Sequence, residues 1–147
     1  MPITKGFRQL MAEASRKIRT LGIEQAKSKY RDAKVVFIDI RDIRELEREG
    51  TIPGAFHAPR GMLEFWVDPE SPYYKEIFGA EREFVLYCQS GWRSALAAAT
   101  LQDMGLTGVC HIEGGFSAWK ASGLPVESKA RRRSAVGLSR GSTQSTP

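Results

Sequence analysis

The sequence is poor in the residues from which disulfide frameworks and metal sites are built. Its 147 residues include only two cysteines and two histidines. Cys88 and Cys110 are too few to make a disulfide framework, which favours a reducing compartment and therefore a cytoplasmic location. We expect neither a resident cofactor nor a bound metal ion.

Long apolar stretches are missing as well. No apolar run approaches the ~18 residues that a membrane-spanning helix needs, so no membrane span is expected. The N-terminus lacks the apolar core of a secretory signal. A hydrophobic content of 41% and a charged content of 27% are typical of a soluble globular protein. The length suffices for one domain with a substantial core.

Acidic residues are scarce at both ends of the chain. The net charge of +5 combines +6 in residues 1–31, −6 in residues 32–127 and +5 in residues 128–147, where no acid occurs. An acidic central part does not look like a nucleic-acid surface. Nucleic acid is therefore not expected as a partner, except through the basic C-terminal tail.

The chain divides into three segments. Residues 1–19 are predicted to form an amphipathic basic helix, residues 20–127 a domain, and residues 128–147 a disordered basic tail. The helix either packs on the domain edge or binds a membrane surface, as a targeting helix would. The tail either aids solubility or contacts RNA, acidic lipid or an acidic partner. The apolar spacing of three and four that predicts the helix extends over Phe7, Leu10, Met11, Ala14, Ile18 and Leu21.

The central segment alternates short apolar strands with helices, which predicts an α/β domain with a parallel sheet covered on both faces. Ligands bind at the carboxyl ends of the strands in such sheets. Asp39, Arg41 and Cys88 all follow strand ends. The expected strands are residues 35–38, 55–58, 84–87 and 108–112, and the expected helices are residues 24–31, 43–49, 61–66, 73–78, 93–105 and 116–122.

The chemistry is concentrated around Cys88. The buried strand of residues 84–87 leads into this cysteine, and a short loop connects it to a helix that begins near Arg93. Backbone N–H groups of such a loop converge on one point, and the positive end of the helix adds to their effect. A thiol held there ionises more readily than a free cysteine and reacts as a thiolate. Cys88 is therefore the candidate nucleophile.

At this point the sequence resembles the rhodanese (thiosulfate sulfurtransferase) family. The resemblance covers roughly residues 20–127, with Thr51 standing where many members have a histidine. It implies a five-stranded parallel sheet flanked by helices, and a cysteine that accepts a sulfane sulfur as a persulfide and passes it to a nucleophile. The motifs that carry it, in family order, are Ile38-Asp39-Ile40-Arg41, Ile52-Pro53-Gly54-Ala55, Cys88-Gln89-Ser90-Gly91-Trp92-Arg93-Ser94, Glu113-Gly114-Gly115-Phe116-Ser117-Ala118-Trp119 and Gly123-Leu124-Pro125.

The resemblance also suggests how the site works. With thiosulfate as donor, the Cys88 thiolate attacks the outer sulfur and sulfite departs, so neither a general acid nor a general base is needed. Cyanide, a thiol or a protein then accepts the sulfur. The sulfur is expected to be held by the backbone amides of Gln89, Ser90, Gly91, Trp92, Arg93 and Ser94.

Several side chains have two possible roles. Arg93 either attracts the anionic donor or braces the loop through a carboxylate such as Asp39. Arg41 either lines the site or forms a structural ion pair. Ser94 either caps the helix or donates to the sulfur. Trp92 either covers the persulfide, together with Phe65 and Trp66, or simply packs as an aromatic side chain. Cys110, His57 and His111 are expected to be structural.

Two other functions remain open. Four residues separate Cys88 from Arg93, whereas related dual-specificity phosphatases and many arsenate reductases have five, which makes a wider loop. The count therefore favours sulfur transfer over phosphatase or arsenate reductase chemistry. A protein-to-protein sulfur carrier or docking module, with the basic tail as its docking arm, is the other alternative.

Overall fold

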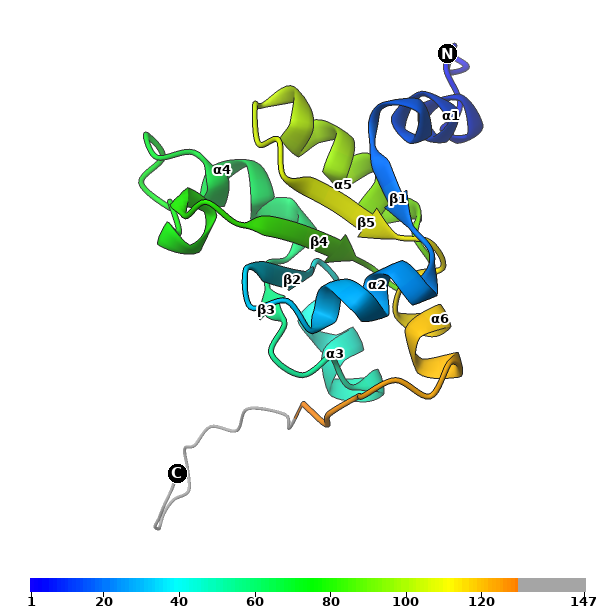
Figure 1. Cartoon of the computed structure of the whole chain (residues 1–147). Helices are drawn as coiled ribbons and strands as arrows, with labels where there is room; N and C mark the ends of the chain where they lie inside the picture. The colour runs from blue at the N-terminus through cyan, green and yellow to red at the C-terminus, as the bar shows by residue number, and fades with distance from the viewer. Residues whose placement is uncertain (130–147) are drawn as a thin grey trace, which may run out of the picture.

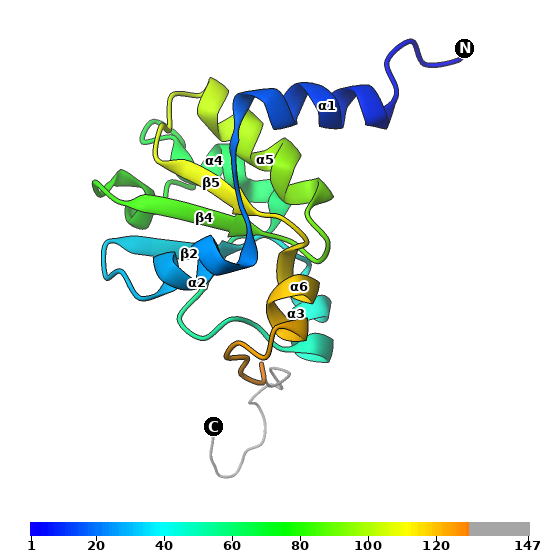
Figure 2. The same ribbon diagram turned by 45° about the vertical axis from the view of Figure 1, so that its right-hand side comes forward.

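The computed structural model describes residues 1–129, so most of the predicted C-terminal tail lies outside the described residues. Five parallel strands form one sheet in the order β1-β5-β4-β2-β3 (Figure 1). Helices lie on both sides of this sheet (Figure 2). The predicted α/β class and its five-stranded parallel sheet are confirmed. The strands are β1 (Arg19–Leu21), β2 (Val35–Asp39), β3 (Phe56–His57), β4 (Glu83–Tyr87) and β5 (Val109–Ile112).

The helices form two layers. The layer with α1, α4 and α5 covers one face, and α2, α3 and α6 lie on the opposite side (Figures 1 and 2). The bounds are α1 (Phe7–Lys17), α2 (Ile23–Tyr30), α3 (Ile43–Glu49), α4 (Leu63–Val67), α5 (Trp92–Asp103) and α6 (Gly115–Ala121), with short 3-10 helices η1 (Arg60–Met62) and η2 (Glu76–Gly79).

The central strand β4 is apolar throughout its buried length because helices cover both of its faces. Phe84 and Leu86 point into the core beneath α1, α4 and α5. Val85 and Tyr87 point into the second core, where Trp119 of α6 is fully buried. The two cores fix the register of β4, so the chain leaves the sheet at a defined point, immediately before Cys88.

The predicted N-terminal helix of residues 1–19 is wrong at both ends, since the helix begins only at Phe7. The helix stops at Lys17, and Arg19–Leu21 pair with Cys110–Ile112 as an edge strand. The three-residue spacing of Ile18 and Leu21 fits a helix, but β5 offers an open row of backbone donors and acceptors that the chain satisfies by pairing. Helix α1 packs against α5; its Ala14 is buried in the core that α5 covers, and so is Ile18, which follows the helix. No helix within residues 1–129 is long and apolar enough to cross a bilayer.

Candidate active site

Cys88 lies at the carboxyl end of β4, where the active loop (residues 88–94) carries the chain into α5. Gly91 caps this helix with a φ angle of 108°, a left-handed conformation that favours glycine. A β-carbon at this position would also lie 3.3 Å from the backbone nitrogen of Gly114. The glycine of the motif is thus required by both backbone conformation and close packing.

The Cys88 sulfur is only 1% exposed and accepts hydrogen bonds from the loop. The backbone N–H groups of Gly91 and Ser94 lie 3.1 Å and 3.4 Å from Sγ. The Ser94 hydroxyl oxygen lies 3.6 Å from the same sulfur. Of the amides expected to face the sulfur, these two approach Sγ itself. Hydrogen bonds from fixed amides favour an anionic sulfur, because they need no reorganisation when the charge forms.

Ser94 does not cap the helix, since that position belongs to Gly91, and it lies beneath the sulfur instead. Its hydroxyl oxygen is 2.9 Å from Nδ1 of His111 on β5. The other ring nitrogen of His111 is 3.1 Å from the hydroxyl of Thr20 on β1. Burial lowers the pKa of His111 to about 4, so the imidazole is neutral at neutral pH. His111 is hydrogen-bonded as expected, but its partner belongs to the active loop. In the sequence, the available signal that His111 lies near the site was its position just before the Glu113-Gly114-Gly115 motif.

Arg93 braces the loop against α3. Its guanidinium makes two hydrogen bonds to the Glu45 carboxylate, at 2.8 Å and 3.0 Å. Arg93 thus braces the loop through a carboxylate, but this carboxylate belongs to Glu45, so the expectation of Asp39 as its partner is wrong. The hydrogen bond from Arg93 lowers the pKa of Glu45, and the same bond raises the pKa of Arg93. The Glu45 side chain also accepts a hydrogen bond from the backbone N–H of Asp42. This bond is part of the capping box that starts α3. The sequence gave no sign of the partner in α5.

Arg41 forms a structural ion pair, which resolves its two possible roles. It is completely buried, bonds to both carboxylate oxygens of Asp39 at 3.0 Å and 2.7 Å, and donates to the Gly50 carbonyl. A further bond of 2.9 Å reaches the side chain of Gln89, and the guanidinium lies 4.2 Å from the Phe116 ring centroid. Burial opposes the charged form of Arg41, but the hydrogen bonds and charge of Asp39 outweigh it and raise the pKa. Arg41 therefore fixes Gln89 from inside the protein.

The Gly114-Gly115 pair holds the opposite side of the loop. The backbone N–H groups of Phe116 and Ser117 donate to the carbonyls of Cys88 and Gln89 at 2.8 Å and 3.0 Å. A β-carbon on Gly115 would lie 2.5 Å from the Cys88 carbonyl oxygen, and its φ of 57° is left-handed. Only glycine lets the start of α6 approach the loop closely enough to form these bonds.

Of the two possible roles of Trp92, the aromatic contact in the structure is made with α1 rather than with Phe65 and Trp66. The Trp92 ring, 59% exposed, packs on Phe7 of α1 with the centroids 5.0 Å apart. Trp66 instead contacts Phe56 on β3. The alternative of simple aromatic packing fits the structure, because α1 reaches over the start of α5 and supplies a partner that lies 85 residues away in sequence.

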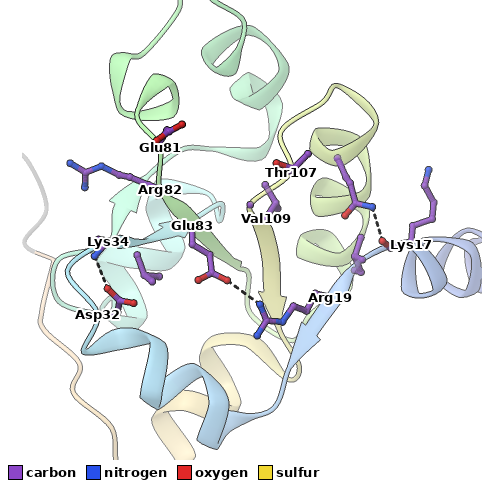
Figure 3. A pocket seen from close by; sticks show the side chains of 13 residues that line it. Lys17, Arg19, Asp32, Lys34, Glu81, Arg82, Glu83, Thr107 and Val109 are labelled. Carbon is purple, nitrogen blue, oxygen red and sulfur yellow. Dashed lines mark hydrogen bonds and ion pairs between the residues drawn. The ribbon is translucent and has the colours of Figure 1, made fainter.

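A broad hollow of about 790 Å³ lies away from this site (Figure 3). The first residues of four strands line it, whereas Cys88 follows the last residue of β4, so the hollow is at the other end of the sheet. Charges of both signs surround it, and Arg19 is paired there with Glu83 at 3.1 Å. It offers neither a nucleophile nor a concentrated charge of one sign.

Known proteins resemble the chain in both sequence and fold. The family model of the rhodanese-like domain matches residues 23–122. A sulfurtransferase of Allochromatium vinosum is 34% identical over 92 residues, which cover 63% of this chain and 78% of that protein. Thiosulfate sulfurtransferase 16, chloroplastic, of Arabidopsis thaliana is 34% identical over 97 residues, covering 62% and 78%. A solved structure from Rhodopseudomonas palustris, described as a protein of unknown function and possible tyrosine phosphatase, is 53% identical with a TM-score of 0.84, covering 86% of this chain and 98% of that one.

Proposed function

The chain belongs to the rhodanese-like domain family, and we propose that it transfers a sulfane sulfur through a persulfide on Cys88. Membership in this family supports sulfur transfer in general, and so do the sulfurtransferases among the relatives of the chain. The observation that carries the finer proposal is the pair of backbone N–H groups, from Gly91 and Ser94, that point at a buried cysteine sulfur. We assign the reaction to the domain of residues 20–127.

The reaction has two steps with thiosulfate as the donor. The Cys88 thiolate attacks the outer sulfur of thiosulfate; the new Sγ–S bond forms while the old S–S bond breaks, and sulfite leaves with its electron pair. An acceptor nucleophile, such as cyanide or a thiol, then attacks the outer sulfur of the persulfide and restores the thiolate. Sulfite is a stable anion, so the first step needs no proton donor.

The geometry suits this chemistry because each step begins and ends with an anion at Cys88. The backbone N–H groups of Gly91 and Ser94 stabilise that anion. The hydrogen bond that Arg41 donates to Gln89, and those that the amides of α6 donate to the loop carbonyls, keep the loop in place. Removing one preorganised donor raises a reaction barrier by roughly 3–4 kcal/mol in comparable sites. Loop geometry should therefore matter nearly as much as the sulfur.

Phosphatase chemistry is less well supported by the same loop. A phosphate dianion is best bound by a guanidinium that makes two parallel hydrogen bonds. Arg93 already makes two such bonds to Glu45, and only four residues separate it from Cys88. The relative described as a possible tyrosine phosphatase makes this alternative worth measuring directly.

The physiological setting follows from chemistry rather than from named partners. The donor is a small sulfur anion such as thiosulfate, and the acceptor is a thiol or a protein nucleophile. Both cysteines are free, which suits the reducing cytoplasm that we propose as the location.

Thiocyanate formation from thiosulfate and cyanide tests the proposed function. We expect turnover by the native protein and none by Cys88→Ser, because a serine hydroxyl is not ionised at neutral pH and cannot carry the sulfur. Cys110→Ser is the matched control, since Cys110 lies on the neighbouring strand, and it should keep its turnover. Unchanged turnover in Cys88→Ser would refute the assignment, and rapid hydrolysis of an aryl phosphate would favour the phosphatase alternative.

A further inference from the structure

A chain of hydrogen-bonding groups connects the buried sulfur to the protein surface. It runs from Cys88 Sγ to Ser94 Oγ (3.6 Å), on to His111 Nδ1 (2.9 Å), and from His111 Nε2 to Thr20 Oγ1 (3.1 Å). Three of these residues are at most 5% exposed, whereas Thr20 is exposed on the edge strand β1. The chain therefore has one reactive end and one end in solvent.

A hollow of about 360 Å³ lies beside this chain and is lined in part by Thr20, His111 and Gly91. It has room for several water molecules, since one occupies about 30 Å³ in the liquid. The Thr20 hydroxyl can therefore exchange protons with water. The sulfur itself is 1% exposed and lacks comparable direct access.

The direction of the hydrogen bonds depends on which nitrogen of His111 carries the proton. A neutral imidazole has one donor and one acceptor. With the proton on Nε2, Nδ1 accepts the Ser94 hydroxyl proton, and Ser94 can only accept from the Cys88 thiol. With the proton on Nδ1, Ser94 accepts from His111, and its own proton can be donated to the sulfur or to the Gly91 carbonyl, which lies 3.3 Å from Oγ. The first arrangement suits a thiol and the second suits an anion.

We propose that Ser94, His111 and Thr20 form a proton path for Cys88, with His111 as a positioning residue that acts through Ser94. On ionisation, the thiol proton passes to Ser94 Oγ, the Ser94 proton to His111 Nδ1, the Nε2 proton to Thr20, and the Thr20 hydroxyl proton to water. Each group gains and loses one proton, so the net products are a thiolate and a proton in solvent. The path ends with Ser94 donating to the sulfur anion, ready to hold a thiolate or a persulfide.

The proposal rests on the proposed function only in taking Cys88 as the reactive sulfur.

The charges that face the path come from several elements. Arg93, at the start of α5, is paired with Glu45 of α3. The buried Arg41–Asp39 pair lies at the end of β2. Glu113, after β5, lines the hollow, to which α1 contributes the uncharged Met11 and Ser15.

Nitrogen-15 NMR of the histidine rings tests the path directly. The protein has two histidines, and His57 serves as an internal reference because its Nε2 lies 2.7 Å from the Arg41 carbonyl and must carry a proton. As pH rises through the ionisation of Cys88, followed by its rate of alkylation, we expect the His111 proton to change from Nε2 to Nδ1. In Cys88→Ser no change is expected over that range. A native His111 that keeps one tautomer while Cys88 ionises would overturn the proposal.

Variants provide a second readout in a Cys110→Ala background, where iodoacetamide reports Cys88 alone. In His111→Leu we expect the midpoint of the alkylation-rate profile to rise by about one pH unit, a tenfold loss of thiolate below the midpoint, as the loss of a hydrogen bond to a charged group predicts. In His111→Asn the midpoint should return much of the way to its native value, since the asparagine amide can donate to Ser94. Thr20→Val, at an exposed position, should shift the midpoint in the same direction by less.

Val109→Ala is the control for loosened packing, because Val109 lies on β5 and belongs to the core on the same side as His111. It should leave the midpoint unchanged. Equal shifts in His111→Leu and Val109→Ala would refute the role of His111. If the native protein takes no sulfur from thiosulfate but its His111 tautomer still follows Cys88, the proposed function fails and the proton path stands.

Discussion

Cys88 directly follows β4 and Cys110 lies on the neighbouring strand β5, and the surroundings of the two cysteines differ. Cys88 receives two backbone N–H groups, whereas the Cys110 thiol lies 3.7 Å from the Phe84 carbonyl and faces a core of apolar side chains. Burial raises the pKa of Cys110 to about 11, which keeps it a thiol at neutral pH. Local hydrogen bonding, more than burial itself, distinguishes Cys88, the sulfur that we propose to be reactive.

His111 gives a prediction about stability and pH. Its pKa falls from 6.5 in the unfolded chain to about 4 in the folded protein because burial disfavours the charged ring. Between these values the unfolded chain binds the proton and the folded protein does not, so acidification favours unfolding. We expect the free energy of unfolding to drop by about 2–3 kcal/mol as pH falls from 6.5 to 4 because of this residue.

Urea denaturation at several pH values measures this effect, and His111→Asn isolates it. The variant is less stable at neutral pH, but it should lack the part of the acid-induced loss that His111 causes. Carboxylates such as Glu45, whose pKa is lowered by Arg93, contribute equally to both proteins and cancel in the comparison. Parallel curves for the native protein and His111→Asn would contradict the prediction.

At the scale of single residues, local motifs were predictable from the sequence and long-range partners were not. Cys88 and its loop were predictable because strand, cysteine, glycine and helix follow one another locally. The partners Glu45 and His111 were not, because they lie 48 residues from Arg93 and 17 residues from Ser94 and meet them only through the sheet topology. The aromatic partner of Trp92 was not predictable for the same reason, since Phe7 is on the N-terminal helix.

Among elements, the active loop is held from three directions. Helix α3 holds it through Glu45, the end of β2 through Arg41, and the start of α6 through backbone donors. Apolar runs made most strands and helices predictable, and the family motifs mark these same contact points. The edge strand β1 was not predictable because three residues contain no periodic pattern, and its pairing with β5 defines it.

The contact between α6 and the loop can be tested with Gly115→Ala. The added β-carbon would overlap the Cys88 carbonyl and displace the active loop, so we expect sulfur transfer to fall by at least tenfold. Gly105→Ala is the matched control, since Gly105 is also left-handed at φ 102° but has nothing within 4 Å of the added carbon. Both variants bear the backbone strain, and only the first should lose activity beyond its loss of stability.

The brace between α3 and α5 can be tested with Glu45→Gln, which removes the charge that Arg93 pairs with. The pair is partly exposed, so the free energy of unfolding should change by less than about 1 kcal/mol. We expect kcat/KM for thiosulfate to fall severalfold because the loop is less well held. The control is Glu64→Gln on α4, which disturbs the ion pair of Glu64 with Arg60 of η1. Higher activity in Glu45→Gln would show that Arg93 serves to attract the donor.

For the whole molecule, the parallel topology explains why one site unites the motifs. The carboxyl ends of β2, β4 and β5 meet at the same edge of the sheet, which brings Arg41, Cys88 and Gly115 together from distant parts of the sequence. The opposite edge has the mixed-charge hollow and no reactive group comparable to Cys88 among the residues described.

The central claim is that Cys88 carries a sulfur, and the mass of the intact protein after treatment with thiosulfate tests it most directly. We predict that the native protein and Cys110→Ser each gain one sulfur atom, that cyanide removes it, and that Cys88→Ser gains none. A native protein whose mass does not change under conditions that leave Cys88 open to alkylation would contradict the account.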